Sequence, residues 1–220
     1  GRFLIFSLFC LASASNPCVT YKVFRKTFKK HITEKKVIKS DDFALNKPDA
    51  TVFYSLNYKG KPLVSKLYRP PFPDPEMPLR EATFMKKFSQ LSSIVQFYSC
   101  YKSGENVEIF MERLGEPLSK RLEQFASISW RSKLKMFLPM TRTLVEIHHE
   151  KMVHGDIKPH NIVLFQNSKG LKFIDFGCSV RQNEIVAGKT LMYAAPELLL
   201  SGTLRARASQ DVWSWVLTMC

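Results

Sequence analysis

The sequence predicts an α+β fold of two lobes, in which a β-rich lobe precedes a mainly helical one. Short runs of β-branched and aromatic residues, separated by turn residues, fill residues 41–113 and are typical of a small sheet. In residues 114–220, apolar residues recur at helical intervals instead. With 220 residues, 45% of them hydrophobic, the chain can bury a sizeable core, as one large domain or two small lobes.

Residues 1–40 precede the two lobes and combine an apolar run with a basic stretch. Residues 3–12 are too short to span a bilayer but resemble the apolar core of a secretory signal, with Ala-Ser-Ala at 12–14 as its cleavage site. Only Arg2 precedes the run and no asparagine lies in an N-x-Ser/Thr acceptor, so a truncated N-terminus stays an alternative. The basic residues that follow predict a solvated or flexible arm: Lys22, Arg25, Lys26, Lys29, Lys30, Lys35, Lys36 and Lys39.

The formal net charge of +14 favours acidic ligands, such as nucleotides, phosphorylated substrates, nucleic acid or an anionic membrane. Aromatic residues are sparse in the basic stretch, so we expect no specific nucleic-acid surface, while membrane association stays open. The five cysteines are an odd number without C-x-x-C spacing, which predicts neither a disulfide framework nor a zinc site. The default location is the reducing cytoplasm, with secretion as the alternative that residues 3–14 leave open.

The first lobe begins with a predicted β-hairpin. Residues 50–68 contain two β-rich runs around a turn at Lys59-Gly60-Lys61. The five prolines of residues 69–78 exclude regular structure, because proline lacks a backbone donor and fixes φ. Residues 79–91 then show helical spacing, which predicts a helix that starts beside Pro78.

Two further strands complete this lobe. They are predicted at residues 94–101 and 106–112, joined by a turn at Ser103-Gly104-Glu105. We therefore expect residues 41–113 to form a four- or five-stranded lobe with one helix.

The second lobe begins with a long predicted helix that ends near His149. Pro139 lies inside it and predicts either a kink or a later start. Two short apolar runs, residues 162–165 and 171–174, predict a pair of strands, and a last helix is predicted at Asp211–Met219.

The strand pair should bring chemically active side chains together. Asp156 lies before its first strand and Asp175 after its second, so both carboxylates are expected at one end of the pair. Asn161 lies between Asp156 and the first strand. Because Mg²⁺ takes oxygen ligands and keeps substrate phosphates among them, two acids and an amide here predict a site for magnesium and phosphate.

Three motifs in this region resemble those of eukaryotic-type protein kinases of the serine/threonine class. Residues 154–161 match the catalytic-loop pattern H-R-D-L-x-x-x-N except at Gly155, Asp175-Phe176-Gly177 match D-F-G, and Ala195-Pro196-Glu197 match A-P-E. The resemblance runs from about residue 41 to 220 and implies a bilobal fold. Helices of that family's large lobe beyond Asp211–Trp215 are missing, so the resemblance implies a large lobe that is incomplete at its C-terminus.

The resemblance implies a role for each matched charged residue. Asp156 would orient or accept the proton of the attacking hydroxyl, and Lys158 would stabilise the transferring γ-phosphoryl group of ATP. Asn161 and Asp175 would hold Mg²⁺. In the small lobe, Val64-Ser65-Lys66 aligns with V-A-x-K; the residues implied there are Lys66 for the α- and β-phosphates and Glu81 as its ion-pair partner.

Residues 109–118 resemble the segment that joins the two kinase lobes. Met111 would lie at the back of an adenine pocket, and Glu112 to Leu114 would offer backbone hydrogen bonds to the base. Val52 and Leu164 would contact the two faces of the ring. Ordinary core packing is the alternative role of these apolar residues.

Several residues depart from the family pattern. Residues 45–52 align with the glycine-rich phosphate loop but contain no glycine, which predicts weaker nucleotide binding. Gly155 replaces the catalytic-loop arginine, so activation by loop phosphorylation is not expected. By the same resemblance Ser65 replaces an alanine beside the adenine, and Thr190 would contact the catalytic loop. Cys178 after D-F-G is expected to be a small buried side chain.

The resemblance implies a protein serine/threonine kinase that uses ATP and Mg²⁺ and acts on a protein hydroxyl. A pseudokinase, which would bind ATP or serve as a scaffold without turnover, is the alternative that the glycine-free loop and Gly155 support. A basic protein that binds nucleic acid or a membrane surface is a third hypothesis, which rests on charge alone.

Overall fold

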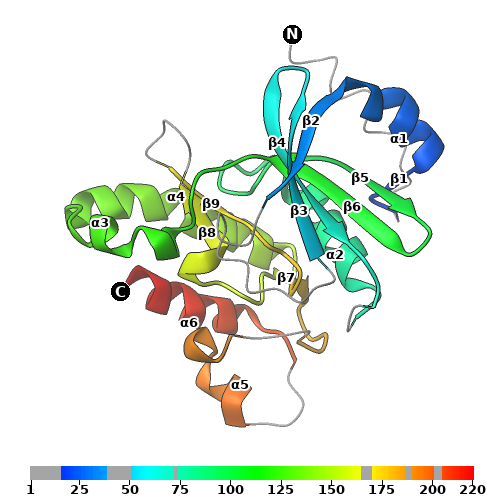
Figure 1. The fold of residues 1–220 in the computed structure, drawn as a ribbon. Coiled ribbons are helices and arrows are strands. Elements are labelled where there is room, and N and C mark those ends of the chain that lie inside the picture. Colours follow the sequence, from blue (N-terminus) through cyan, green and yellow to red (C-terminus); the bar gives the residue numbers. More distant parts are fainter. Residues whose placement is uncertain (1–15, 39–50, 72–73, 165–169, 187–189, 201–204) are drawn as a thin grey trace. The chain divides into compact units, whose positions relative to one another are not determined.

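The computed structural model describes residues 16–38, 51–71, 74–164, 170–186, 190–200 and 205–220. The chain divides into two compact units (Figure 1). The first unit comprises Gly1–Lys86 and Gln96–Arg113, and the second comprises Lys87–Val95 and Leu114–Cys220. The apolar run of residues 3–14 and most of the glycine-free loop lie outside the described residues.

A six-stranded sheet forms the centre of the first unit. The predicted hairpin is confirmed, because β3 and β4 pair antiparallel and Lys59 and Gly60 both have positive φ, as a tight hairpin turn requires. The expectation of four or five strands within residues 41–113 is confirmed, because four strands lie there among the described residues, and residues 19–37 add two more to the same sheet. The sheet order is β1-β5-β6-β4-β3-β2, with β1 Val19–Thr20, β2 Ile32–Val37, β3 Thr51–Tyr58, β4 Lys61–Tyr68, β5 Phe97–Ser103 and β6 Asn106–Glu112.

The basic stretch folds onto this sheet, so the flexible alternative is wrong, whereas its described Lys and Arg side chains are exposed, as the solvated alternative expects. Helix α1 spans Tyr21–Thr27, a 3₁₀ turn, η2, spans Lys29–His31, and β2 follows. Phe24 and Phe28, four residues apart, are buried against Phe110 in an aromatic cluster. Burial of these two rings stabilises the packing of the segment on the sheet, although lysines dominate its sequence.

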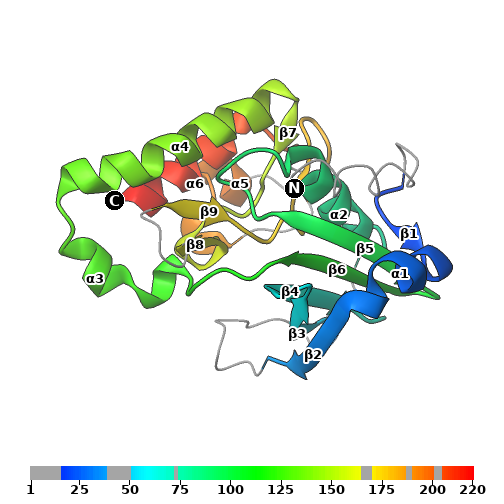
Figure 2. The same cartoon turned by 90° about the horizontal axis from the view of Figure 1, so that it is seen from above.

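Helix α2, Met77–Phe88, begins one residue before Pro78 and confirms the predicted helix. Its Ala82, Phe84, Met85 and Phe88 are buried. In the view of Figure 2, α1 and α2 lie on opposite sides of the sheet. Strand alternation therefore decides which helix each side chain of β4 faces.

A disulfide bond joins Cys18, directly before β1, to Cys100 on β5, so the expectation against disulfide bonding is wrong for this pair. The two cysteines come together because β1 pairs in parallel with β5, next to the bond. Cysteine spacing could not reveal this, since the partners are 82 positions apart in the sequence. The disulfide fastens the start of the basic stretch to the sheet.

Replacement of both Cys18 and Cys100 by serine is expected to lower the free energy of unfolding by about 2–4 kcal/mol. The bond closes a long loop, so its loss returns conformational freedom to the unfolded chain. Urea unfolding measures the change, with Cys220→Ser, which removes an exposed free thiol, as the control. An unchanged midpoint in the double variant would contradict the prediction.

The second unit is mainly helical. The long predicted helix is α4, which continues through Pro139, so the alternative of a later start is wrong. The last predicted helix is α6, which begins three residues before Asp211. Bounds of the helices are α3 Leu122–Ala126, α4 Trp130–His149, α5 Pro196–Leu200 and α6 Ala208–Met219, with 3₁₀ turns η4 Leu118–Lys120, η5 Pro159–Asn161 and η6 Leu191–Tyr193.

Two small antiparallel strand pairs lie within the second unit. The predicted pair is confirmed as β8, Ile162–Leu164, with β9, Leu171–Phe173. The other pair is β7, Met152–Val153, with β10, Val180–Arg181. Among the described residues, none of the helices combines the length and the apolar character that crossing a bilayer requires.

Candidate active site

The loop that precedes β8 brings an acid, a cation and an amide into direct contact, as the sequence predicts. The Asp156 Oδ2 atom lies 2.7 Å from Lys158 Nζ and accepts a 2.9 Å hydrogen bond from Asn161 Nδ2. The same amide nitrogen donates to the backbone oxygen of Asp156 at 2.8 Å. The turn η5 makes these contacts possible, because it returns Asn161 toward Asp156 within five residues.

Thr190 closes this cluster from a distant part of the sequence. Its hydroxyl donates to Asp156 Oδ1 at 2.6 Å and accepts from Lys158 Nζ at 2.6 Å. The contact of Thr190 with the catalytic loop, which the resemblance implied, is therefore present. Both carboxylate oxygens of Asp156 are thus fixed in direction by neighbouring donors.

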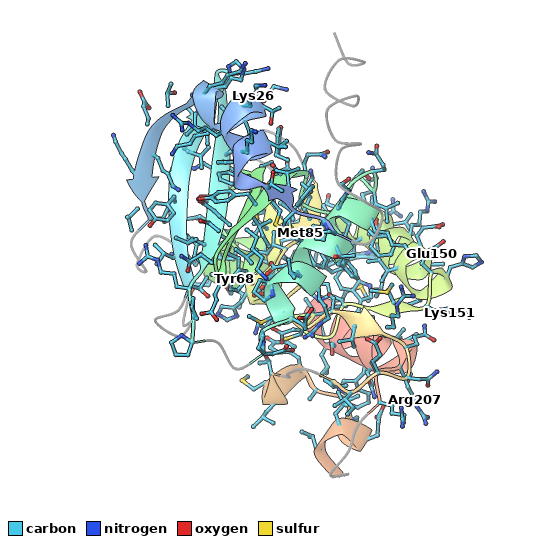
Figure 3. All side chains as sticks on the ribbon, turned by 90° about the vertical axis from the view of Figure 1, so that its right-hand side faces the viewer. Lys26, Tyr68, Met85, Glu150, Lys151 and Arg207 are labelled. Atoms are coloured by element: carbon cyan, nitrogen blue, oxygen red, sulfur yellow. A yellow bond between two sulfur atoms is a disulfide. The ribbon has the colours of Figure 1, made fainter. Side chains whose placement is uncertain are left out.

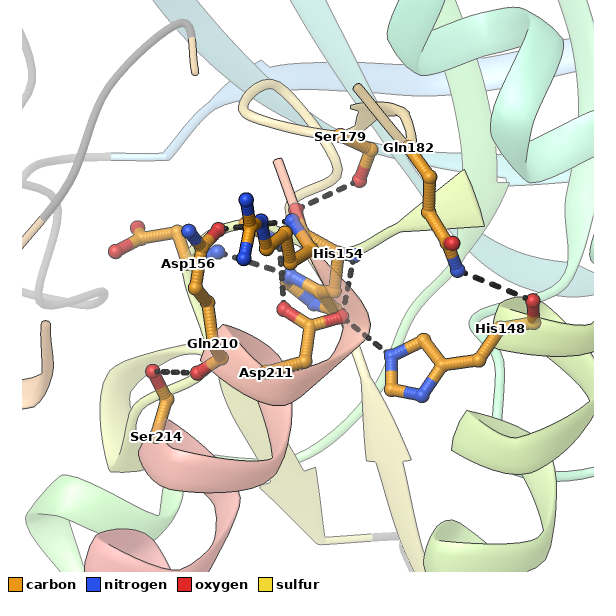
Figure 4. A network of polar contacts seen from close by, with 10 residues as sticks. His148, His154, Asp156, Ser179, Gln182, Gln210, Asp211 and Ser214 are labelled. Atoms are coloured by element: carbon orange, nitrogen blue, oxygen red, sulfur yellow. Dashed lines mark hydrogen bonds and ion pairs between the residues drawn. The ribbon is translucent and has the colours of Figure 1, made fainter. Parts of the chain in front are cut away.

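Asp211 on α6 binds the backbone of the loop, a role that the sequence analysis did not predict. Its carboxylate accepts the backbone N–H of His154 at 2.8 Å and of Gly155 at 2.9 Å. It also lies 2.9 Å from His148 Nε2, so it connects α4, the loop and α6 (Figure 4). The sequence showed only an acid in the first turn of a predicted helix, and nothing in it signalled burial.

His154 is fully buried between Phe173 and Phe176. Burial holds the pKa of its imidazole below the usual value, and the nearby carboxylates of Asp211 and Asp156 only partly oppose this. A neutral ring fits this apolar site. The backbone oxygen of His154 accepts a 2.9 Å hydrogen bond from the Ser179 hydroxyl, which joins the loop to the segment after D-F-G.

The structure gives a local reason for glycine at position 155. Gly155 has φ +83°, in the left-handed region, and a Cβ there would lie 2.5 Å from the backbone oxygen of Cys178. An arginine in this backbone conformation would meet the same contact. Cys178 itself is half-buried, so the expectation of a buried thiol is wrong.

Gly155→Ala is expected to lower the free energy of unfolding by more than the roughly 1–3 kcal/mol that left-handed backbone strain alone costs. Gly60→Ala is the matched control, because Gly60 has φ +78° and open space around it. Thermal or urea unfolding of both variants isolates the contact with Cys178. Equal losses in the two variants would show that the loop moves aside at no cost.

Asn161 and Asp175 supply side-chain oxygen atoms of the kind that coordinate a magnesium ion. The amide nitrogen of Asn161 donates to Asp156, which leaves the amide oxygen for a cation. The backbone N–H of Ile174 donates to the backbone oxygen of Asn161 at 2.9 Å, so Asp175 follows directly on a residue tied to Asn161. Amide and carboxylate oxygens are the hard donors that Mg²⁺ prefers, and the residues present therefore fit this metal.

The first unit contains the predicted pair of Lys66 and Glu81. Lys66 Nζ lies 2.9 and 2.8 Å from the two carboxylate oxygens of Glu81, and both side chains are almost fully buried. The Tyr68 hydroxyl also donates to Glu81. A sequence pattern alone cannot distinguish such a pair from two solvated surface charges; its burial excludes that alternative.

Ser65 does not occupy the position that the resemblance assigned to it. Its hydroxyl donates to Glu108 at 2.5 Å, whereas the adjacent Lys66 points to Glu81 on α2. Neighbouring residues of a strand face opposite sides of the sheet, so Ser65 faces away from Lys66 and Val64 shares the face of Lys66. The expectation of Ser65 beside the adenine is therefore wrong.

Ser65 instead belongs to a buried polar group on the α1 side of the sheet. Glu108 accepts from Ser65, from Lys35 at 2.6 Å and from the Tyr101 hydroxyl at 3.0 Å. Glu108 is 2% exposed, so its charge depends on these donors. Lys35 lies on β2, so its contact with Glu108 attaches the basic stretch to the sheet at a second place, besides the Cys18–Cys100 disulfide.

The expected adenine contacts are divided between the two units. Val52 on β3 and Met111 on β6 belong to the first unit, and Leu114 and Leu164 belong to the second. The N–H of Glu112 donates to the Gln96 oxygen at 3.0 Å.

Comparison with known protein families identifies the family of this chain. A family model described as protein kinase domain matches residues 50–220. The chain belongs to the protein kinase family. Its fold class is the predicted one, a β-rich lobe followed by a mainly helical lobe.

Individual kinases resemble this kinase chain at modest identity. CDPK-related kinase 7 of Arabidopsis thaliana is 33% identical over 145 residues, which are 61% of this chain and 24% of that protein. Calcium-dependent protein kinase 31 of the same plant is 33% identical over 153 residues, which are 64% of this chain and 31% of that protein. Dual specificity protein kinase zak2 of Dictyostelium discoideum is 29% identical over 147 residues, which are 61% of this chain and 22% of that protein. The matches therefore span about a quarter of the length of these relatives.

Proposed function

We propose that the chain is an active protein serine/threonine kinase that transfers the γ-phosphoryl group of ATP to a protein hydroxyl. The observation that carries the proposal is the contact group of Asp156, Lys158, Asn161 and Thr190. A carboxylate, an ammonium group and an amide within hydrogen-bond distance are what phosphoryl transfer needs, because it depends mainly on positioning and charge stabilisation.

Asp156 is the group that orients the attacking hydroxyl. Asn161 and Thr190 fix the direction of its carboxylate, so no side-chain rotation has to be frozen when a substrate arrives. The carboxylate would accept the hydroxyl proton as the bond to phosphorus forms. Lys158 keeps a positive charge beside it, where it can stabilise the negative phosphoryl group.

The residues that would hold magnesium and ATP are the remaining charged members of the set. Asn161 and Asp175 would hold Mg²⁺, which neutralises charge on the phosphates when bound. Lys66, fixed by Glu81, would bind the α- and β-phosphates. Val52, Met111, Leu114 and Leu164 would contact the adenine, and the backbone of Glu112 to Leu114 would offer hydrogen bonds to the base.

Specificity for serine and threonine is the finer part of the proposal. It is supported by Lys158 in the D-x-K-x-x-N form of the loop and by relatives such as the calcium-dependent kinases. One relative bears a dual-specificity name, so the hydroxyl type needs its own measurement. Acid hydrolysis of the phosphorylated product is expected to yield phosphoserine or phosphothreonine and no phosphotyrosine.

A pseudokinase is the second candidate, and the glycine-free residues 45–52 support it. Gly155 no longer does so by itself, because its backbone conformation and its contact with Cys178 explain it locally. Retention of the charged group around Asp156 together with the Lys66–Glu81 pair favours turnover over scaffolding.

The deciding experiment is transfer of labelled γ-phosphate from Mg·ATP to a generic basic and a generic acidic protein, with the full-length protein as enzyme. Asp175→Ala is the control, because it removes one of the two proposed magnesium donors. Transfer that disappears in the control supports the kinase. Absence of transfer, with ATP binding retained, would establish the pseudokinase instead.

A further inference from the structure

The outer surface of the folded basic stretch gathers positive charge around one hollow. Lys22, Arg25 and Lys26 of α1 and Lys30 of η2 line it. All four side chains are exposed, and Figure 3 shows Lys26 on the outside of α1. Spacing of three and four residues places Lys22, Arg25 and Lys26 on one side of α1, and Lys30 of η2 adds its charge to the same hollow.

These four cations lie in a stretch without acidic residues. Residues 16–33 contain no Asp or Glu, and in the described part of the chain none of the four side chains forms an ion pair. Unpaired like charges repel one another, so a bound anion would relieve an existing cost. The surface is therefore prepared for a ligand with clustered negative charge.

The pKa of His31 is consistent with this positive field. It lies below the usual histidine value because of partial burial, with Lys59 and Lys30 adding repulsion against the protonated ring. A bound anion would favour the protonated ring and so raise this pKa. The histidine thereby offers a readout beside the hollow.

The burial of the neighbouring aromatic rings narrows the class of partner. Phe24 and Phe28 are packed into the sheet, so they are unable to enter a bilayer or to stack on nucleic-acid bases. Charge complementarity alone remains as the source of recognition.

We propose that this hollow is a docking site for an acidic segment of a protein partner, whose clustered carboxylate or phosphoryl groups the four cations bind. The packing of Phe24 and Phe28, the Cys18–Cys100 bond and the pairing of β2 hold the backbone in place before binding, which reduces the entropy cost. The residues that line the hollow lie outside residues 50–220, the part that matches the family model, and none of them belongs to the proposed catalytic group.

The test measures binding of a fluorescent acidic peptide of glutamate and serine, with and without phosphorylated serines, to the full-length protein. The patch variant combines Lys22→Gln, Arg25→Gln, Lys26→Gln and Lys30→Gln, which keeps helix propensity close to that of the parent. The matched control combines Arg131→Gln, Lys135→Gln, Arg142→Gln and Lys151→Gln and removes the same charge from exposed residues around α4. Affinity is expected to fall by about tenfold or more in the patch variant only.

Further readouts make the result decisive. Binding should weaken as salt rises, and the peptide should raise the pKa of His31 in a nuclear magnetic resonance titration. Equal losses in both variants would reduce the effect to net charge and so overturn the proposal. Absence of binding to the wild-type protein would overturn it as well. Stronger patch-dependent binding of anionic phosphatidylserine vesicles or of an RNA oligonucleotide would overturn it in favour of those surfaces. A separate test of ATP turnover keeps this outcome distinct from that of the kinase proposal.

Discussion

Asp156→Asn is expected to lower kcat by about 10²- to 10⁴-fold while leaving ATP affinity nearly unchanged. Asparagine keeps the shape of the side chain but loses the charge and the acceptor that the substrate hydroxyl needs. Its amide would also place a donor against Lys158 and Asn161, where the wild-type carboxylate accepts from Asn161 and lies beside the ammonium group. Single-turnover phosphate transfer and a nucleotide-binding titration measure the two quantities.

Asp74→Asn is the matched control for this variant. Asp74 pairs with Arg80 in the first unit and takes no part in the proposed chemistry, so this substitution removes the same charge elsewhere. Its kcat is expected to stay near that of the wild type. Wild-type turnover in Asp156→Asn would sink the assignment of Asp156 as the residue that orients the hydroxyl.

Glu81→Ala is expected to lower the free energy of unfolding by about 3–5 kcal/mol, and it should also abolish transfer. Lys66 and Glu81 are 3% and 1% exposed at their side chains, so removal of the carboxylate leaves a buried ammonium group without its counter-ion. Such a charge costs far more than a lost surface pair, which is worth at most about 1 kcal/mol. Urea unfolding of the full-length protein measures the loss.

The double variant Lys66→Met with Glu81→Leu separates charge from packing. Apolar residues of similar volume remove both buried charges, so stability is expected to return to near the wild-type value while activity stays absent. A double variant as unstable as Glu81→Ala would show that the Tyr68 contact or local packing, rather than the charge pair, determines stability.

Local patterns predicted most of the fold. The hairpin of β3 and β4 and the helix α2 follow from alternation, glycine and proline, which act over a few residues. The basic stretch was predicted wrongly because the lysines outnumber Phe24 and Phe28, although the four-residue spacing of these rings was a usable signal. The disulfide was not predictable, because it depends on pairing between strands far apart in the sequence.

The candidate site divides in the same way. Contacts within residues 154–161 are short-range and followed from the motif, whereas the support from Asp211 needed the position of α6. Ser65 was misplaced although strand alternation with Lys66 was available from the sequence. Thr190 came from the resemblance alone, since nothing local connects it with Asp156.

The ion pair between Lys35 and the buried Glu108 has a practical consequence for where the folded domain starts. The family match begins at residue 50, but a fragment cut there would lose Lys35 and leave the Glu108 carboxylate with fewer donors. It would also uncover Phe110, which α1 now covers, and open β3 as an edge strand free to pair with other molecules. Expression of such a fragment should give aggregated material, whereas a fragment that keeps Cys18 and β2 should stay monomeric in size-exclusion chromatography.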